Sequence, residues 1–290
     1  MKTKTIRSGH VNAGNRVGNG VSNGVGNVVG QGAGTQRRHL LRAALSSVGT
    51  VALAGCDKLS NNEAFVDVLK SAQHLSRAVH KIVPGRKAMA QEFAPADVAA
   101  HFRSNGTLMP ADADYQALLK AGFSAWKLRV GGLVEKPAAF TLAELRAMPS
   151  RTQITRHDCV EGWSSIGQWK GVQLSHVLAQ VRPLANAKYV VFRCADSMDG
   201  PALDGRDSRY YESVDLDDAN HVQTVLAYEL NGQPLPVSNG APLRVRVERQ
   251  LGYKHAKYVM RIELVESFAQ LRGGNGGYWE DSGYEWYAGI

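Results

Sequence analysis

Residues 156–164 read RHDCVEGWS, and this stretch decides how the rest of the chain is interpreted. The 290 residues include three cysteines, Cys56, Cys159 and Cys194, so a disulfide framework does not stabilise the chain. The first 55 residues predict export to an oxidising compartment, where a lone thiol is oxidised unless it is buried or bound. The sequence therefore raises the question of what Cys159 binds.

Four roles for Cys159 follow from residue chemistry alone. A structural zinc site needs a second short-spaced pair of ligands beside His157 and Cys159, and none is present. A cysteine nucleophile is disfavoured, because Asp158 is adjacent and no glycine-rich oxyanion loop follows. A buried core thiol is common for an isolated cysteine. A thiolate ligand to a redox metal is the fourth role, and Arg156 would favour the ionised thiol. Residue chemistry leaves the last two roles open.

The first 55 residues have the pattern of an export leader. Residues 1–34 are rich in Gly, Asn and Val and have no amphipathic period, so we expect them to be disordered. Arg37 and Arg38 then precede an apolar stretch at 43–55, which is typical of a twin-arginine signal peptide. That stretch is short for a bilayer span but suits the apolar region of a secretory signal. We therefore expect a protein exported to the periplasm.

The end of the leader, LAGC at 53–56, resembles a lipobox, in which the cysteine is acylated and becomes the mature N-terminus. A lipid on Cys56 would hold the protein on a membrane surface without a spanning helix. Residues 1–55 contain seven Lys/Arg and no Asp/Glu, so their removal takes the formal net charge from +8 to +1. The basic balance belongs to the leader, and we expect no nucleic-acid partner for the mature chain.

Apolar spacing and one capping pattern predict three helices in the mature chain. A repeat of three and four residues predicts helices over Glu63–Val83 and Leu174–Val181. Thr141 and Glu144 form a capping-box pattern, which predicts a short helix over Leu142–Met148.

Strands are expected in larger number than helices. Apolar or alternating runs predict strands at Trp126–Val130, Tyr189–Phe192, Leu243–Val247 and Tyr258–Leu264. In the third run one face is apolar and the other is charged. The dipeptide Asn231-Gly232 predicts a hairpin. Because the strands and helices follow no regular βαβ rhythm, we expect an α+β fold.

Segments on both sides of Cys159 occur in the order found in one enzyme family. They are CVEGWS at 159–164, Trp169-x-Gly171, LAYELNGQPLP at 226–236, NGAPLR at 239–244 and GYKHAK at 252–257. This ordered set resembles the sulfite oxidase superfamily of molybdopterin enzymes. It is most similar to the branch of the bacterial periplasmic methionine sulfoxide reductase catalytic subunit. The resemblance spans about residues 126–268 and implies a sulfite-oxidase-type molybdopterin-binding fold, preceded by an N-terminal helical arm.

The resemblance implies roles for particular residues. Cys159 matches the cysteine that ligates molybdenum, so it is both the metal ligand and a catalytic residue. Asn239 and Arg244 match positions that hold the pterin and phosphate ends of the cofactor, and a guanidinium fork suits a phosphate. The resemblance also implies cofactor contacts from a loop that covers the phosphate, formed by His255, Ala256 and Lys257. Asn105 is a further contact from upstream in the sequence.

The segment Phe192–Asp196 departs from the family pattern, because Arg193 and Cys194 stand where the methionine sulfoxide reductase has a small hydroxylated residue. We expect Cys194 to be a buried thiol and not a metal ligand. Arg193 is our second candidate catalytic residue, facing a strongly polar or anionic substrate. A surface arginine at the end of a strand is the alternative.

The sequence divides into four parts: a leader at 1–55, a helical arm and linker at 56–125, a catalytic domain at 126–270, and a tail at 271–290. The tail contains GGNGGYWE at 273–280 and YEWY at 284–287. We expect it to pack on the domain as an aromatic flap, with a partner-docking surface as the alternative.

The resemblance implies a periplasmic reductase of S-oxide substrates with a Cys-ligated oxo-molybdenum centre and nucleotide-free Mo-molybdopterin. Sulfite-type oxidation of a small anionic substrate is the alternative reaction, and a cofactor-free lipoprotein binding module is the alternative class. No Cys-x-x-Cys-His motif is present, so we expect no haem. Electrons would then come from a separate partner, such as a membrane haem protein or a quinone-linked protein. Twin-arginine export suits a cofactor that must be inserted before the membrane is crossed.

Overall fold

A computed structural model of the chain describes Asn62, Leu75, Val79 and residues 88–198 and 208–290. Except for Asn62, these belong to one compact unit, 70–290. The predicted leader, the lipid site at Cys56 and most of the predicted helix at 63–83 lie outside the described residues. Leu75 and Val79 are helical and exposed. Among the described helices, none is long and apolar enough to cross a membrane.

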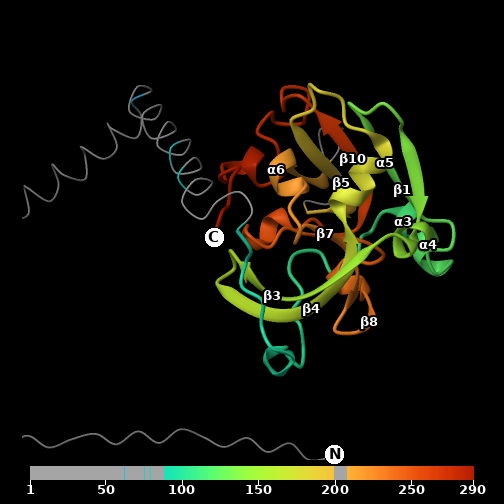
Figure 1. Cartoon of the computed structure of the whole chain (residues 1–290), viewed down its shortest axis with the longest axis vertical. Coiled ribbons are helices and arrows are strands. Elements are labelled where there is room, and N and C mark those ends of the chain that lie inside the picture. Colours follow the sequence, from blue (N-terminus) through green and yellow to red (C-terminus); the bar gives the residue numbers. More distant parts are fainter. Residues whose placement is uncertain (1–61, 63–74, 76–78, 80–87, 199–207) are drawn as a thin grey trace, which may run out of the picture. The chain divides into compact units, whose positions relative to one another are not determined.

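Two five-stranded sheets form the framework (Figure 1). The first has the order β2 (Ala138–Thr141), β1 (Lys127–Gly132), β10 (Val259–Val265), β5 (Tyr189–Ser197) and β6 (Arg209–Asp215). The second has the order β3 (Ser150–Cys159), β4 (Trp163–Gln173), β7 (Val225–Leu230) and β8 (Gln233–Pro234), with β9 (Arg244–Arg246) also paired to β7. The β1–β10 pair is parallel and the other pairs are antiparallel.

Short helices connect and cover the strands. The α-helices are α3 (Ala113–Lys120), α4 (Leu142–Ala147), α5 (Leu174–Val181) and α6 (Leu216–Ala219). The 3₁₀ turns are η1 (Pro95–Asp97), η2 (Val237–Asn239), η3 (Gly252–Lys254) and η4 (Glu280–Ser282). In the described part of the chain strands predominate and no regular βαβ alternation occurs, so the predicted α+β class is confirmed.

Elements whose prediction depends on neighbouring residues form as expected. At α4 the Thr141 side chain accepts from the Glu144 N–H, and the Glu144 carboxylate accepts from the Thr141 N–H. Between β7 and β8, Asn231 and Gly232 have φ angles of 52° and 74°, as a tight hairpin turn requires. The predicted helix at 174–181 is α5, which buries four apolar residues.

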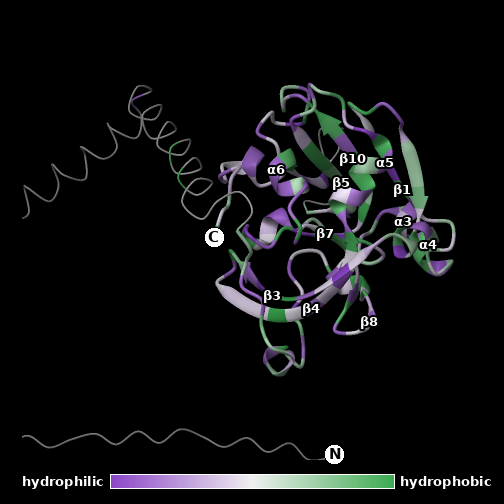
Figure 2. Ribbon diagram, in the orientation of Figure 1, coloured by the Kyte–Doolittle hydropathy of each residue, from purple (hydrophilic) through white to green (hydrophobic). Residues whose placement is uncertain are grey.

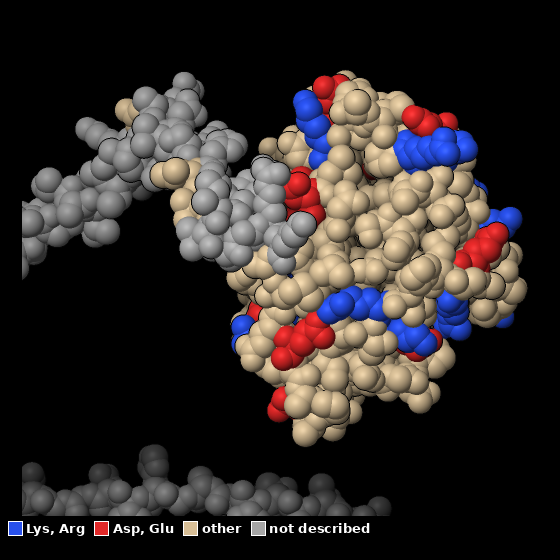
Figure 3. Space-filling model, viewed as in Figure 1, with Lys and Arg blue, Asp and Glu red and all other residues tan. Residues whose placement is uncertain are grey.

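Both sheets contribute to one main hydrophobic core. Residues of β1, β5 and β10 face it, among them Leu128, Phe192 and Ile262, none of which is exposed. Figure 2 shows the apolar colouring along β5 and β10. On the molecular face of Figure 3, cationic and anionic side chains lie beside each other.

The strand β9 departs from the sequence-based expectation of one apolar and one charged face. Both faces are buried, and the side chains of Arg244 and Arg246 have no exposed surface. The Arg246 guanidinium is paired with Glu248 at 2.6 Å. Both guanidiniums lie over the indole of Trp169, at 5.2 Å for Arg244 and 4.5 Å for Arg246 from the ring centroid. The charged face of this strand therefore points into the protein.

Candidate active site

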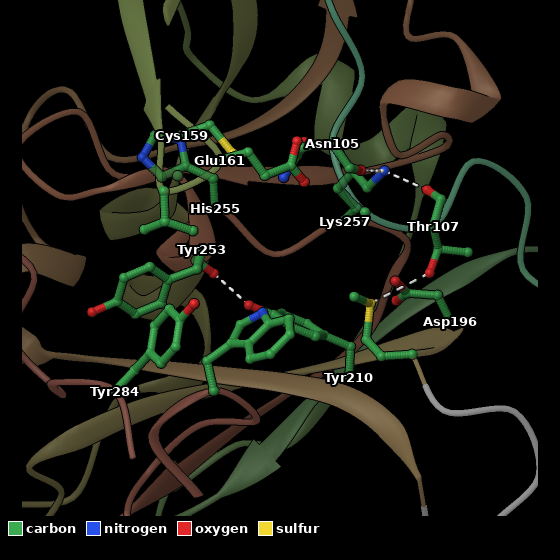
Figure 4. Close-up of a pocket in the computed structure, with 15 residues that line it drawn as sticks. Asn105, Thr107, Cys159, Glu161, Asp196, Tyr210, Tyr253, His255, Lys257 and Tyr284 are labelled. Atoms are coloured by element: carbon green, nitrogen blue, oxygen red, sulfur yellow. Dashed lines mark hydrogen bonds between the residues drawn. The ribbon is translucent and has the colours of Figure 1, made fainter. Parts of the chain in front are cut away.

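A cavity of about 340 Å³ lies where the β3–β4 hairpin, η3, the end of β5 and the C-terminal tail meet. It is lined by four of the residues singled out in the sequence: Asn105, Cys159, His255 and Lys257. Figure 4 shows these residues on one side of the space, with Tyr210, Tyr253 and Tyr284 on the other. The fold thus brings together residues more than 150 positions apart in the sequence.

Cys159 is the last residue of β3 and faces Trp163 of β4 across the hairpin turn. The turn needs a residue with positive φ at Gly162 (84°), whose N–H donates to the Cys159 carbonyl at 3.0 Å. The thiol is half-buried at the cavity wall. Burial raises its pKa, while the Glu161 backbone N–H and the positive charge of Arg244 act in the opposite direction. A bound metal would shift the thiol to the thiolate.

Arg244 is buried behind the cavity and is short of partners. Its Nη1 donates to the Asn239 carbonyl at 3.2 Å, and Nη2 donates to Asn105 Oδ1 at 3.4 Å. Neither Arg244 Nε nor Asn239 Nδ2 has a hydrogen-bond partner among the described residues. Burial, reinforced by repulsion from Arg246, lowers the pKa of Arg244 to about 9.

Lys257 is a second buried cation at the same place. Its Nζ donates to the carbonyls of Asn105 and Thr107 at 2.5 Å and of Ser238 at 3.0 Å. Burial and repulsion from Arg244 lower its pKa to about 7, although Asp196 acts in the opposite direction. The lysine is therefore held by backbone dipoles, with no carboxylate hydrogen bond from the described residues.

Two buried imidazoles, His157 and His255, lie with their ring centroids 5.1 Å apart, and His255 lines the cavity. His157 Nδ1 lies 3.0 Å from Arg246 Nη1, and His255 Nε2 lies 3.1 Å from the Gln250 carbonyl. Burial and the neighbouring guanidiniums lower both pKa values well below the ordinary value, so both rings are neutral. Each ring keeps one nitrogen without a partner among the described residues.

These residues fit a molybdopterin cofactor. The donor set combines a thiol, two buried cations that lack a hydrogen-bonded carboxylate, and unpartnered donors on Arg244 and Asn239. Buried donors and charges of this kind are costly unless an acceptor or counter-ion meets them. A group with a phosphate, a hydrogen-bonding heterocycle and a thiol-binding metal would meet all three needs.

The structure separates Arg193 from this group. Its side chain pairs with Glu263 at 3.3 Å and lies over the Tyr211 ring, in a groove whose lining does not include Cys159 or Lys257. Cys194 is buried, as expected. Ala256 is buried too, and its carbonyl accepts from the Val245 N–H at 2.8 Å. We do not place Arg193 in the active site.

Asp196 is a cavity residue that the sequence reasoning missed. The pairing of β5 with β6 shifts register between Arg193 and Ser197, so strand alternation alone does not indicate that Asp196 reaches the cavity. Trp279 and Tyr284 were also missed as cavity residues, because their position depends on where the tail packs.

Comparisons with known proteins agree with this geometry. The family model described as "Oxidoreductase molybdopterin binding domain" matches residues 116–270. The chain is 34% identical over 253 residues to the "Putative protein-methionine-sulfoxide reductase subunit YedZ1" of Azospira oryzae, and the match covers 87% of both chains. It is 41% identical over 151 residues to the "Protein-methionine-sulfoxide reductase catalytic subunit MsrP" of Xanthomonas axonopodis pv. citri.

The MsrP match covers 51% of this chain and 47% of the relative, so the chain spans about half the length of that protein. Among solved structures, the sulfane dehydrogenase SoxCD of Paracoccus pantotrophus is 24% identical with a TM-score of 0.44, covering 49% of this chain and 38% of the other. The extent of the family match and of the 34%-identical relative confirms the resemblance drawn from the sequence. The chain belongs to the oxidoreductase molybdopterin-binding family, as a molybdenum-cofactor enzyme.

Proposed function

We propose that the chain is a periplasmic reductase of S-oxide substrates in which Cys159 ligates molybdenum. One observation carries the assignment: the Cys159 thiol shares its cavity with Lys257, a buried cation without a hydrogen-bonded carboxylate, and the buried Arg244 contacts the cavity residue Asn105. The relatives are described as protein-methionine-sulfoxide reductases, which supports the choice of reaction.

In this proposal Arg244 and Lys257 hold the cofactor's phosphate, and Asn239 with His255 donates to its ring system. Two cations suit the charge of one phosphate group, which is why we propose the nucleotide-free form. When bound, the cofactor supplies two-electron redox chemistry that no side chain provides. The chain itself binds, orients and shields the reacting groups.

Reduction of an S-oxide consumes two electrons and two protons and releases a sulfide and water, so the site needs a proton donor. Asp196 is buried in the cavity wall, and its Oδ1 has no hydrogen-bond partner among the described residues. Burial raises its pKa to about 6, against the opposing charge of Lys257. We assign Asp196 the role of holding a proton at its carboxyl oxygen and delivering it to the departing oxygen.

Electrons would come from a separate carrier, either a membrane haem protein or a quinone-linked protein, since the sequence has no haem-attachment motif. Twin-arginine export and a lipid on Cys56 are part of this proposal and rest on the leader sequence. A lipid anchor would keep the enzyme at the membrane where such carriers reside.

The test is metal analysis of the mature chain purified from a molybdenum-replete host. Wild type is compared with Cys159→Ser and with Cys194→Ser, which removes the other described thiol. We expect near-stoichiometric molybdenum and pterin in wild type and Cys194→Ser, and loss or a changed metal spectrum in Cys159→Ser. Reduced viologen as electron donor then reports S-oxide reduction.

Three outcomes would contradict the proposal in different ways. Folded wild-type protein without molybdenum or pterin would indicate a cofactor-free binding module. A loaded enzyme that oxidises sulfite and leaves S-oxides unchanged would indicate the sulfite-type reaction. Equal metal content and spectra in all three proteins would remove Cys159 as the ligand.

A further inference from the structure

The C-terminal tail forms one wall of the cavity. Trp279 and Tyr284 line it together with Tyr253 of η3. Both tail residues lie beyond residues 116–270, which the family model matches. The part of this wall that the tail contributes therefore lies outside the residues that the family model matches.

A buried ion cluster fixes the tail in this position. Lys254 Nζ donates to Glu212 of β6 at 2.5 Å and to Glu280 of the tail at 2.6 Å, and all three side chains are buried. The Tyr278 N–H donates to the Tyr211 carbonyl at 3.0 Å, and Trp286 Nε1 donates to Ser213 Oγ at 2.8 Å. A wall held by buried charges and strand contacts is already organised before a ligand arrives.

The wall consists of aromatic rings that pack on one another. Trp279 stacks on Tyr284 with centroids 5.3 Å apart, and Tyr284 meets Tyr253 edge-on at 5.4 Å. The hydroxyls of Tyr210 and Tyr253 donate to the backbone carbonyls of Tyr253 and Glu285, at 2.5 and 2.6 Å, so they are already engaged. Tyr284 is 41% exposed and therefore stands at the mouth of the cavity.

The opposite side of the cavity is polar. Figure 4 shows Cys159, Glu161, Asn105 and Lys257 across the space from Tyr253 and Tyr284. A ligand that spans the cavity would place a polar group on one side and an apolar group against the rings. An S-oxide with an aryl or large alkyl substituent has this division, and sulfur packs favourably against aromatic rings.

We propose that Trp279 and Tyr284 bind the apolar substituent of the substrate and set specificity for S-oxides that carry an aryl or large alkyl group. This inference rests on the proposed function and names the substrate class for the same cavity. Replacing a methyl by a phenyl group that is buried on the wall increases affinity by about tenfold or more.

The test uses the loaded, mature enzyme with measured molybdenum content and two sulfones as non-reacting probes, dimethyl sulfone and methyl phenyl sulfone. Calorimetry gives the ratio of their dissociation constants for wild type, Trp279→Ala and Tyr284→Ala. Trp286→Phe is the matched control, because Trp286 lies outside the cavity lining and the substitution keeps an aromatic ring in the tail while removing only the indole hydrogen bond to Ser213. Specificity constants for the two corresponding sulfoxides are measured alongside.

We expect wild type and Trp286→Phe to bind methyl phenyl sulfone about tenfold more tightly than dimethyl sulfone. The ratio should approach one in Trp279→Ala and fall several-fold in Tyr284→Ala. Because the Tyr284 side chain is partly exposed, Tyr284→Ala should fold even if Trp279→Ala does not, and it then carries the test. An unchanged ratio at wild-type molybdenum content would overturn the proposal. Loss of molybdenum from both variants but not from the control would overturn it too, because the wall would then contact the cofactor.

The binding measurement separates this inference from the proposed function. A loaded enzyme that shows the expected sulfone ratios but reduces no S-oxide would refute the function and leave the wall as a binding surface for apolar groups. A loaded enzyme that reduces both sulfoxides with equal specificity constants in every variant would refute the inference alone.

Discussion

Lys254 and Lys257 are three residues apart and both buried, yet their ammonium groups have different kinds of hydrogen-bond partner. Lys254 donates to two carboxylates, Glu212 and Glu280, and these raise its pKa against the effect of burial. Lys257 donates to three backbone carbonyls, and burial with repulsion from Arg244 lowers its pKa to about 7. The first cluster is complete within the protein, and the second is short of negative charge.

The difference indicates which cluster is structural and which binds a ligand. A buried cation with its own carboxylates needs nothing further and fixes the segments that supply them. A buried cation without them raises the free energy of the empty protein unless an anion is bound. The comparison therefore indicates that Lys254 holds the tail, and it supports our proposal that Lys257 holds the cofactor's phosphate.

The largest expected effect comes from breaking the complete cluster. Lys254→Met leaves Glu212 and Glu280 buried without their cation, so we expect the free energy of unfolding to fall by about 3–5 kcal/mol. Urea denaturation measures it, with Lys257→Met as the matched control that removes a lysine from the same loop. Equal losses in the two variants would contradict the distinction between the clusters.

A second prediction concerns Asp196, the carboxyl that acts on Lys257 electrostatically without a hydrogen bond to it. If Asp196 delivers a proton, Asp196→Asn lowers kcat by about 100-fold or more, with molybdenum content unchanged. Because its pKa is about 6, wild-type kcat should fall as pH rises through about 6, and the asparagine variant should lack this limb. A pH profile with the same limb in both proteins would assign the proton to another group.

A third prediction concerns cofactor retention. Lys257→Met removes a cation from the incomplete cluster, so we expect at least about tenfold weaker retention of the cofactor, roughly 1.4 kcal/mol. Lys257→Arg keeps the charge and should retain most of the cofactor. Pterin and molybdenum released on dialysis measure the effect, and equal release from wild type and Lys257→Met would remove Lys257 from the phosphate site.

The sequence predicted best where the cause is local. The α4 capping box and the Asn231-Gly232 turn need contacts within three residues, and both form as expected. Four cofactor candidates, including Cys159 and Lys257, line one cavity because the ordered motifs reflect the family's fold.

Properties that depend on distant segments were not predictable. The alternation in β9 shows which residues share a face, but only packing against Trp169 and Glu248 decides that the charged face is buried. Arg193 was chosen for its charge, but it lines the groove beside Glu263, whereas Asp196, three residues later across an irregular part of β5, lines the cavity. The aromatic wall depends on pairing between the tail and β6, about 70 residues away, which no local pattern shows.

The smallest expected effect is a pH dependence of the cofactor-free protein. The folded-state pKa of Lys257 is about 7, below its ordinary value of 10.5, so between these values the unfolded chain binds more protons than the folded one. The free energy of unfolding should therefore rise with pH from about 7, with a slope of at most about 1.4 kcal/mol per pH unit from this group. Denaturation of wild type and Lys257→Met, both freed of cofactor, at pH 7 and pH 8 measures the difference, because the variant lacks this rise. In the loaded protein a bound phosphate would hold the ammonium charged and remove the rise as well. A rise of equal size in the variant would mean that Lys257 is not the group responsible for it. The two lysines would then not differ in the way the structure indicates.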